Sequence, residues 1–138
     1  MYDSILVATD GSDPANRAVE HGIELAERYD AAVHALVVVD TGRYGEPALS
    51  SAELVIEELE DEARELLAEV EARADARGVR LETACKHGDP HEVIISYGDE
   101  VDADVTILGA HGRSATGHHI GSVANRVASG IQRPVLLT

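Results

Sequence analysis

Short apolar runs alternate with longer segments of helical periodicity along the whole chain of 138 residues. The apolar runs, each expected to form a strand, are Ser4–Ala8, Val33–Val39, Val79–Cys85, Val105–Leu108 and Pro134–Thr138. Strict alternation of strands and helices predicts an α/β fold: an open, doubly wound, Rossmann-like parallel sheet of five strands with four helices. The length is typical of one domain, so we expect residues 1–138 to form a single domain.

The helical segments carry capping signals and apolar stripes. Asp13 and Asp89 each precede a proline, so we expect both aspartates to cap helices. The first helix has an apolar face that includes Tyr29. The longest helix starts near Ser51 and is ended by Gly78. Its apolar residues step by three and four and predict one buried stripe of Ala52, Val55, Ile56, Leu59, Ala63, Leu66, Leu67, Val70 and Ala74.

The charge of the chain is strongly negative. It has 26 Asp and Glu against 11 Lys and Arg, a net charge of -15, and Lys86 is its single lysine. An acidic chain that keeps arginine but almost no lysine is typical of proteins in a high-salt cytoplasm, where screening weakens the repulsion between like charges. The sequence therefore predicts a halophilic protein, with an ordinary acidic soluble protein as the alternative.

The same composition argues against several partners. Duplex nucleic acid and anionic membranes bind basic surfaces, so we expect neither as a partner. No apolar stretch approaches the roughly 20 residues of a transmembrane helix. Because the N-terminal residues lead directly into a predicted strand, we expect no signal peptide. Cys85 is the single cysteine, which fits a reducing, cytoplasmic location.

A glycine-punctuated loop follows the fourth predicted strand. It runs from Gly109-Ala110-His111-Gly112-Arg113 to Gly121-Ser122, directly before the last predicted helix. Glycine lets backbone N–H groups approach an anion closely, and a helix start adds unpaired N–H groups with a partial positive charge. The pattern therefore predicts a phosphate-binding loop, with a flexible connection as the alternative.

The loop after the first strand is the second segment that carries chemistry. Ligands of open α/β sheets bind beyond the carboxyl ends of the strands, where the strand order reverses. Asp10 follows the first strand, whereas the turn His87–Asp89 after the third strand shows only capping residues. We therefore expect the order 3-2-1-4-5, with Asp10 beside the glycines. A flavodoxin-like order, which has its switch between the first and third strands, is the less favoured alternative.

Taken together, these segments resemble the universal stress protein family, specifically its ATP-binding branch. Four landmarks in register carry the resemblance: Ala8–Ser12, Val38-Val39-Asp40, Gly88-Asp89-Pro90, and Leu108–Arg113 followed by Gly121-Ser122-Val123. The resemblance spans residues 1–138 and implies a regulatory protein that binds ATP and forms a homodimer. Mg²⁺ would accompany the triphosphate.

The resemblance also implies a role for each matching residue. Asp10, with Ala8 and Thr9, resembles the part of the family site that receives adenosine. Val38 resembles the residue whose backbone reads the edge of adenine. The ribose- and phosphate-binding loop of the family corresponds to Gly109, Gly112, Gly121, Ser122 and Val123. For Asp10, a helix-capping or turn role is the alternative.

The glycine loop departs from the family pattern in its spacer. Eight residues, Arg113–Ile120, separate Gly112 from Gly121, one fewer than in the pattern. A shorter loop changes the phosphate end of the site, so AMP or ADP are alternatives to ATP. Arg113 is a candidate phosphate contact or a surface arginine, and His111 a loop residue that can pack over the ribose. His118 and His119 are interpreted as a solvated pair, and we expect no metal-ligating side chains.

Three classes of function remain open at this point. A nucleotide-binding regulator is favoured because the sequence has a phosphate-binding loop but no P-loop lysine, dedicated base or paired carboxylates. A slow ATP hydrolase or adenylyl-transfer enzyme would depend on Arg113 and His111. A non-nucleotide interaction module of the same fold is the third.

The last apolar segment predicts self-association. An unpaired strand at the edge of a sheet is prone to pair with another chain. We therefore expect the strand Pro134–Thr138 to pair with its mate across a two-fold axis, which gives a homodimer.

The halophile hypothesis predicts how folding depends on salt. We expect the chain to be unfolded or only marginally folded in dilute buffer and to gain stability as KCl is added, because screening relieves the repulsion among its acidic residues. Circular dichroism across a KCl series measures this dependence. Full folding in dilute buffer would contradict the hypothesis.

Overall fold

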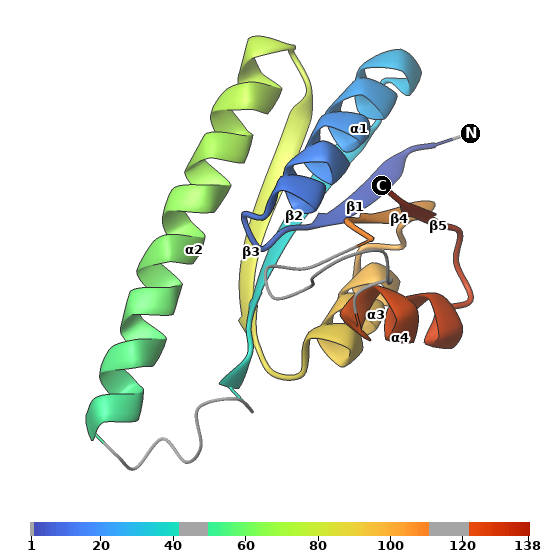
Figure 1. Cartoon of the computed structure of the whole chain (residues 1–138). Helices are drawn as coiled ribbons and strands as arrows, with labels where there is room; N and C mark the ends of the chain where they lie inside the picture. Colours follow the sequence, from blue (N-terminus) through green and yellow to red (C-terminus); the bar gives the residue numbers. More distant parts are fainter. Residues whose placement is uncertain (1, 42–49, 111–121) are drawn as a thin grey trace.

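The computed structural model describes residues 2–41, 50–110 and 122–138. These residues form a five-stranded parallel sheet in the order β3-β2-β1-β4-β5, flanked by four helices (Figure 1). The predicted fold and strand order are confirmed. In chain order the elements are β1 (Ser4–Ala8), α1 (Asp13–Tyr29), β2 (Ala32–Val39), α2 (Ser50–Ala76), β3 (Arg80–His87), α3 (Pro90–Glu100), β4 (Val105–Leu108), α4 (Ser122–Gly130) and β5 (Val135–Leu137).

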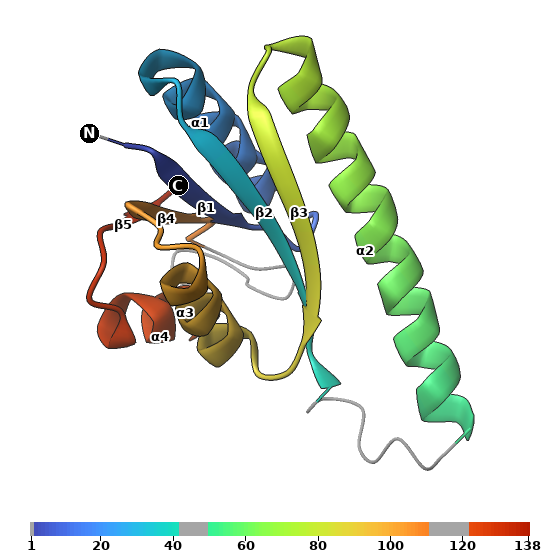
Figure 2. The same ribbon diagram turned by 180° about the vertical axis from the view of Figure 1, so that it is seen from behind.

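Helices cover both faces of the sheet. α1 and α2 lie on one face, and α3 and α4 lie on the other (Figure 2). Successive residues of β1 point to opposite faces, so Ile5 and Val7 join the core under α1 and α2 while Leu6 joins the core under α3 and α4. All three side chains are at most 1% exposed. Burial on both faces explains why the central strands are continuous apolar runs.

The apolar stripe of α2 is buried over only part of its length. Ala63, Leu67, Val70 and Ala74 are buried, whereas Val55, Ile56 and Leu59 are half-buried. The 27 residues of α2 rise about 40 Å. The eight residues of β3 span only about 26 Å. The first turns of α2 therefore extend past the sheet, and the prediction of one continuously buried stripe is wrong for Val55, Ile56 and Leu59. The side chain of Ala52 lies outside the part of the chain that the structure describes.

Ser12, and not Asp13, is the N-cap of α1. The Ala15 N–H donates to Ser12 Oγ at 3.3 Å, while Asp13 is the first residue of the helix. The Ser12 N–H in turn donates to Asp10 Oδ1 at 2.9 Å, which fixes the turn before the helix. Tyr29 also differs from its predicted inward position: it is 47% exposed and its ring meets Tyr2 edge-on.

Asp89 occupies the N-cap position of α3 but makes no capping hydrogen bond with its side chain. Its Oδ1 instead lies 2.6 Å from His91 Nδ1. The predicted N-cap position of Asp89 is therefore confirmed, but the capping hydrogen bond expected from its side chain is not present.

Asp104 ties the amino end of β4 to that of β1. Its Oδ2 accepts hydrogen bonds from the backbone N–H groups of Asp3 at 2.7 Å and Ser4 at 3.0 Å. These hydrogen bonds favour the ionised carboxylate and lower the pKa of Asp104. The two strands that flank the switch point are thus held in register at the edge opposite the predicted site.

β3 and β5 form the two edges of the sheet, as predicted for both. β3 pairs only with β2 and β5 only with β4 among the described strands. Within the ranges 2–41, 50–110 and 122–138, no helix combines the length and the apolar character needed to cross a bilayer.

Candidate functional site

The strand order reverses between β1 and β4. The chain goes from β1 to β2 on one side, and later places β4 on the other side of β1. Val7 is the register partner of Ile107, so the carboxyl ends of the two strands are neighbours. The loop that contains Asp10 and the start of the glycine loop therefore leave the sheet side by side, at the place where α/β sheets bind ligands.

The loop after β1 is a tight turn built from its own side chains. Thr9 is 6% exposed, and its N–H donates to the Leu36 carbonyl at 2.9 Å. The Gly11 N–H donates to Thr9 Oγ1 at 3.2 Å, and Gly11 has a φ of 80°, which favours glycine. Asp10 Oδ1 accepts a hydrogen bond from the Ser12 N–H. The turn role, which was the alternative interpretation of Asp10, is therefore present in the structure.

Gly109 touches the first turn of α1. A Cβ built on Gly109 would lie 2.8 Å from both the carbonyl carbon and the Cβ of Pro14, and 2.9 Å from the Ala15 nitrogen. The absence of a side chain therefore lets the glycine loop start directly against the helix that follows Asp10. Gly109 has a packing role within the protein that is independent of any ligand.

Val38 lies beyond the end of β1. Ala8, the last residue of β1, is the register partner of Leu36, and β2 continues to Val39. On its other side Val38 pairs with Lys86 of β3. The stretch of β2 around Val38 therefore borders the Thr9–Asp10 turn at the carboxyl edge, and the Val38 side chain packs on the core under α3 and α4.

The remaining predicted site residues belong to the glycine loop and α4. Ser122 opens α4 and is exposed, and Val123 is half-buried against the core under α3 and α4. Four other predicted site residues, and the histidine pair, lie outside the described residues: His111, Gly112, Arg113, Gly121, His118 and His119. The structure thus brings together the loops of Asp10 and Gly109, with Val38 along the same edge.

Comparison with known proteins identifies the family. The family model described as "Universal stress protein family" matches residues 1–138. The chain belongs to this family. A universal stress protein of Methanocaldococcus jannaschii is 36% identical over 139 residues, which cover 99% of this chain and 82% of the relative.

Solved structures of the same family share the fold. The universal stress protein UspA from Lactobacillus plantarum superposes with a TM-score of 0.91 at 27% identity, over 99% of this chain and 97% of its own. A crystal structure of a universal stress protein in complex with cAMP superposes with a TM-score of 0.71 at 28% identity. That alignment covers 99% of this chain and 96% of the other.

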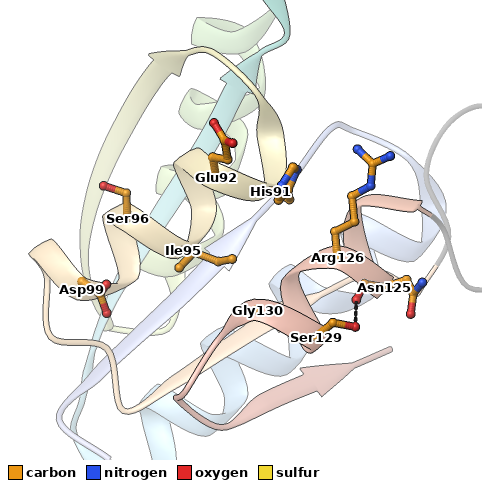
Figure 3. A pocket seen from close by; sticks show the side chains of 9 residues that line it. All are labelled: His91, Glu92, Ile95, Ser96, Asp99, Asn125, Arg126, Ser129 and Gly130. Atoms are coloured by element: carbon orange, nitrogen blue, oxygen red, sulfur yellow. Dashed lines mark hydrogen bonds between the residues drawn. The ribbon is translucent and has the colours of Figure 1, made fainter.

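A groove lies between α3 and α4, away from the carboxyl ends of β1 and β4 (Figure 3). It has a volume of about 810 Å³. Its lining residues are His91, Glu92, Ile95, Ser96, Asp99, Asn125, Arg126, Ser129 and Gly130. None of the predicted site residues is among them. The sequence pattern does not predict this groove, because the groove forms only where α3 and α4, two separate segments of the chain, pack together.

Asp89, His91 and Glu92 form a compact group at one end of this groove. Their donor atoms all lie within 4.8 Å of one another. The group occupies the N-terminus of α3, where the partial positive charge of the helix favours carboxylates and opposes a cation. The electrostatics of the helix therefore account for the two carboxylates without a metal ion.

The contact at Gly109 leads to a stability prediction. We expect Gly109→Ala to lower the free energy of unfolding by about 1 to 3 kcal/mol, because the new methyl group overlaps the first turn of α1. Denaturant unfolding in high salt measures the change.

Gly98→Ala in α3 is the matched control. Its new Cβ would lie 3.5 Å from Leu6 Cδ2 and 3.7 Å from Thr106 Oγ1, which are ordinary contacts. Because alanine favours helix over glycine, we expect this variant to keep its stability or gain up to about 1 kcal/mol. Equal effects of the two substitutions would contradict a specific role for Gly109.

Proposed function

We propose that this chain is a regulatory universal stress protein that binds an adenine nucleotide, with ATP and Mg²⁺ as the expected ligand. The observation that carries the proposal is the meeting of the Asp10 and Gly109 loops at the switch point of the sheet, in a member of this family. The related protein solved with cAMP supports an adenine nucleotide as the ligand class.

Each described residue has a chemical role in this proposal. The backbone of β2 near Val38 discriminates the edge of adenine, since it borders the Thr9–Asp10 turn. The Asp10 carboxylate accepts a hydrogen bond from a ribose hydroxyl in addition to holding its own turn. The start of α4 at Ser122 supplies N–H groups and a hydroxyl to phosphate.

The phosphate end of the proposed site rests on residues outside the described ranges. Gly112, Arg113 and Gly121 belong to it, with His111 over the ribose. Because the spacer is one residue shorter than the family pattern, ADP and AMP remain candidates beside ATP. Mg²⁺ would be held chiefly by phosphate oxygens and water, which is its usual mode in nucleotide sites.

A regulatory role is favoured over catalysis. Lys86, the single lysine, lies on β3, where its Nζ is 3.6 Å from Glu100 Oε2 and 5.2 Å from the centre of the Tyr97 ring. It is therefore engaged against α3 rather than placed at the carboxyl ends of β1 and β4. An ATP hydrolase or adenylyl-transfer activity is the alternative, and a non-nucleotide interaction module is the second alternative.

The proposal includes a homodimer in a cytoplasm of high salt. β5 is an edge strand, and its Leu136 is 41% exposed, so a second copy of β5 would cover an apolar side chain and an unpaired strand edge. The acidic composition supports the high-salt setting and argues against nucleic acid and anionic membranes as partners.

Nucleotide binding can be tested with a substitution that preserves the turn. Asp10→Asn keeps the oxygen that accepts from Ser12 N–H but loses the charge. We expect it to weaken the binding of a fluorescent ATP analogue, measured with Mg²⁺ in high salt, by about tenfold or more. The matched control is Asp13→Asn, three residues away in the first turn of α1, which should leave the affinity unchanged.

Two results would contradict this part of the proposal. One is absence of binding by the unsubstituted chain at about millimolar nucleotide, the weak end of specific affinities. The other is equal binding by the Asp10 and Asp13 variants, which would reduce Asp10 to its turn role. Steady release of phosphate from ATP would instead favour the hydrolase alternative.

The dimer can be tested by sedimentation at micromolar protein and high salt. We expect a dimer, and we expect Leu136→Lys to convert it to monomers because the new charge would be buried at the interface. Leu54→Lys is the control, since Leu54 is 61% exposed on α2. A monomeric unsubstituted chain would overturn the proposed dimer.

A further inference from the structure

Three segments meet at Thr138, the residue that follows β5. Its N–H donates to the Leu108 carbonyl at 2.9 Å, and its carbonyl accepts from the Ala110 N–H at 3.0 Å. Its hydroxyl donates to the Pro14 carbonyl at 3.2 Å and lies 3.4 Å from the Leu108 carbonyl. One residue thereby contacts the end of β4, the start of the glycine loop and the first turn of α1.

The hydrogen bond from Thr138 to Pro14 is made by the side chain, whereas the bonds to Leu108 and Ala110 in the strand ladder are made by the backbone. The backbone bonds of Thr138 continue the ladder between β4 and β5, which any residue can do. The bond to Pro14 requires a side-chain hydroxyl and crosses from the sheet to a helix. Pro14 is also the residue against which Gly109 packs without room for a Cβ.

Pro14, Gly109 and Thr138 therefore set the distance between the Asp10 turn and the start of the glycine loop. Pro14 follows the turn that Asp10 holds, and Gly109 begins the glycine loop. The steric contact at Gly109 prevents the two loops from coming closer, and the Thr138 hydroxyl opposes their separation. A ligand that touches both loops is sensitive to this spacing, since a misplacement of about 1 Å is enough to weaken preorganised binding strongly.

We propose that Thr138 is a positioning residue for the nucleotide, through which the β5 edge is coupled to the site at the carboxyl ends of β1 and β4. The proposal rests on the proposed function. Pairing of β5 with a second copy restrains the strand that carries Thr138, and so restrains both loops before the nucleotide arrives. By linkage, nucleotide and dimerisation then strengthen each other by the same factor.

The test compares isosteric and conservative substitutions at Thr138. Thr138→Val removes the hydroxyl and keeps the shape, and we expect it to weaken binding of the fluorescent ATP analogue by about three- to tenfold, the value of one hydrogen bond. Thr138→Ser keeps the hydroxyl and should restore the affinity. The dimer dissociation constant of the unsubstituted chain should fall when nucleotide is added, and this effect should shrink in Thr138→Val.

Thr106→Val is the matched control. The Thr106 side chain is fully buried in β4, and its Oγ1 has no hydrogen-bond partner within the part of the chain that the structure describes. The same loss of a hydroxyl there should leave the nucleotide affinity and the dimer constant unchanged. A merely structural role of Thr138 would lower its unfolding midpoint while the affinity of the folded protein stays constant.

Each outcome is decisive. Weaker binding in Thr138→Val with rescue by Thr138→Ser, and no change in Thr106→Val, supports the proposal. Equal affinities of Thr138→Val and the unsubstituted chain overturn it and leave the proposed function intact. Absence of nucleotide binding in the unsubstituted chain overturns the proposed function, and with it this inference.

Discussion

The parallel pairing of β1 with β4 is the interaction on which the rest of the structure depends. Every residue of β4 is buried, as are the three central residues of β1, so both strands lie in the core between two layers of helices. At one end of this pair, Asp104 binds the backbone of Asp3 and Ser4. At the carboxyl end of the pair, the Asp10 loop and the glycine loop begin side by side. Burial of the apolar side chains of β1 and β4 stabilises the pairing of the two strands, and this pairing fixes where the two loops begin.

Contacts at the carboxyl ends of β1 and β4 explain the residue types found at Asp10, Gly109 and Thr138. Gly109 lacks a side chain because Pro14 occupies the space that a Cβ would need. Asp10 holds a turn that makes Ser12, one residue earlier than expected, the cap of α1. Thr138 links the same helix to the end of β4. The proposed roles toward a ligand therefore fall on positions that already have roles within the fold, as expected of a preorganised site.

Much of the fold could be predicted from the sequence, because each level of the pattern pointed to the same result. The strand order followed from one observation: the candidate ligand-binding residues come after the first and fourth strands. Features that depend on how separate elements pack together could not be predicted from the sequence. The outer half of α2 looks as apolar as the inner half, yet only the inner half lies over the sheet, because a helix of that length exceeds the strands beneath it. The groove between α3 and α4 has no local signature at all, since its walls come from segments about thirty residues apart.

The most direct measurement is a nucleotide titration followed residue by residue through backbone amide NMR signals, with Mg²⁺ in high salt. Binding at the switch point predicts shifts at Gly11 and Ser12, in β2 around Val38, and at Gly109 and Ala110, with smaller effects in the α3–α4 groove. Shifts confined to groove residues such as Glu92, Ser96 and Arg126, with the amides of Gly11 and Gly109 unchanged, would contradict a nucleotide site between β1 and β4.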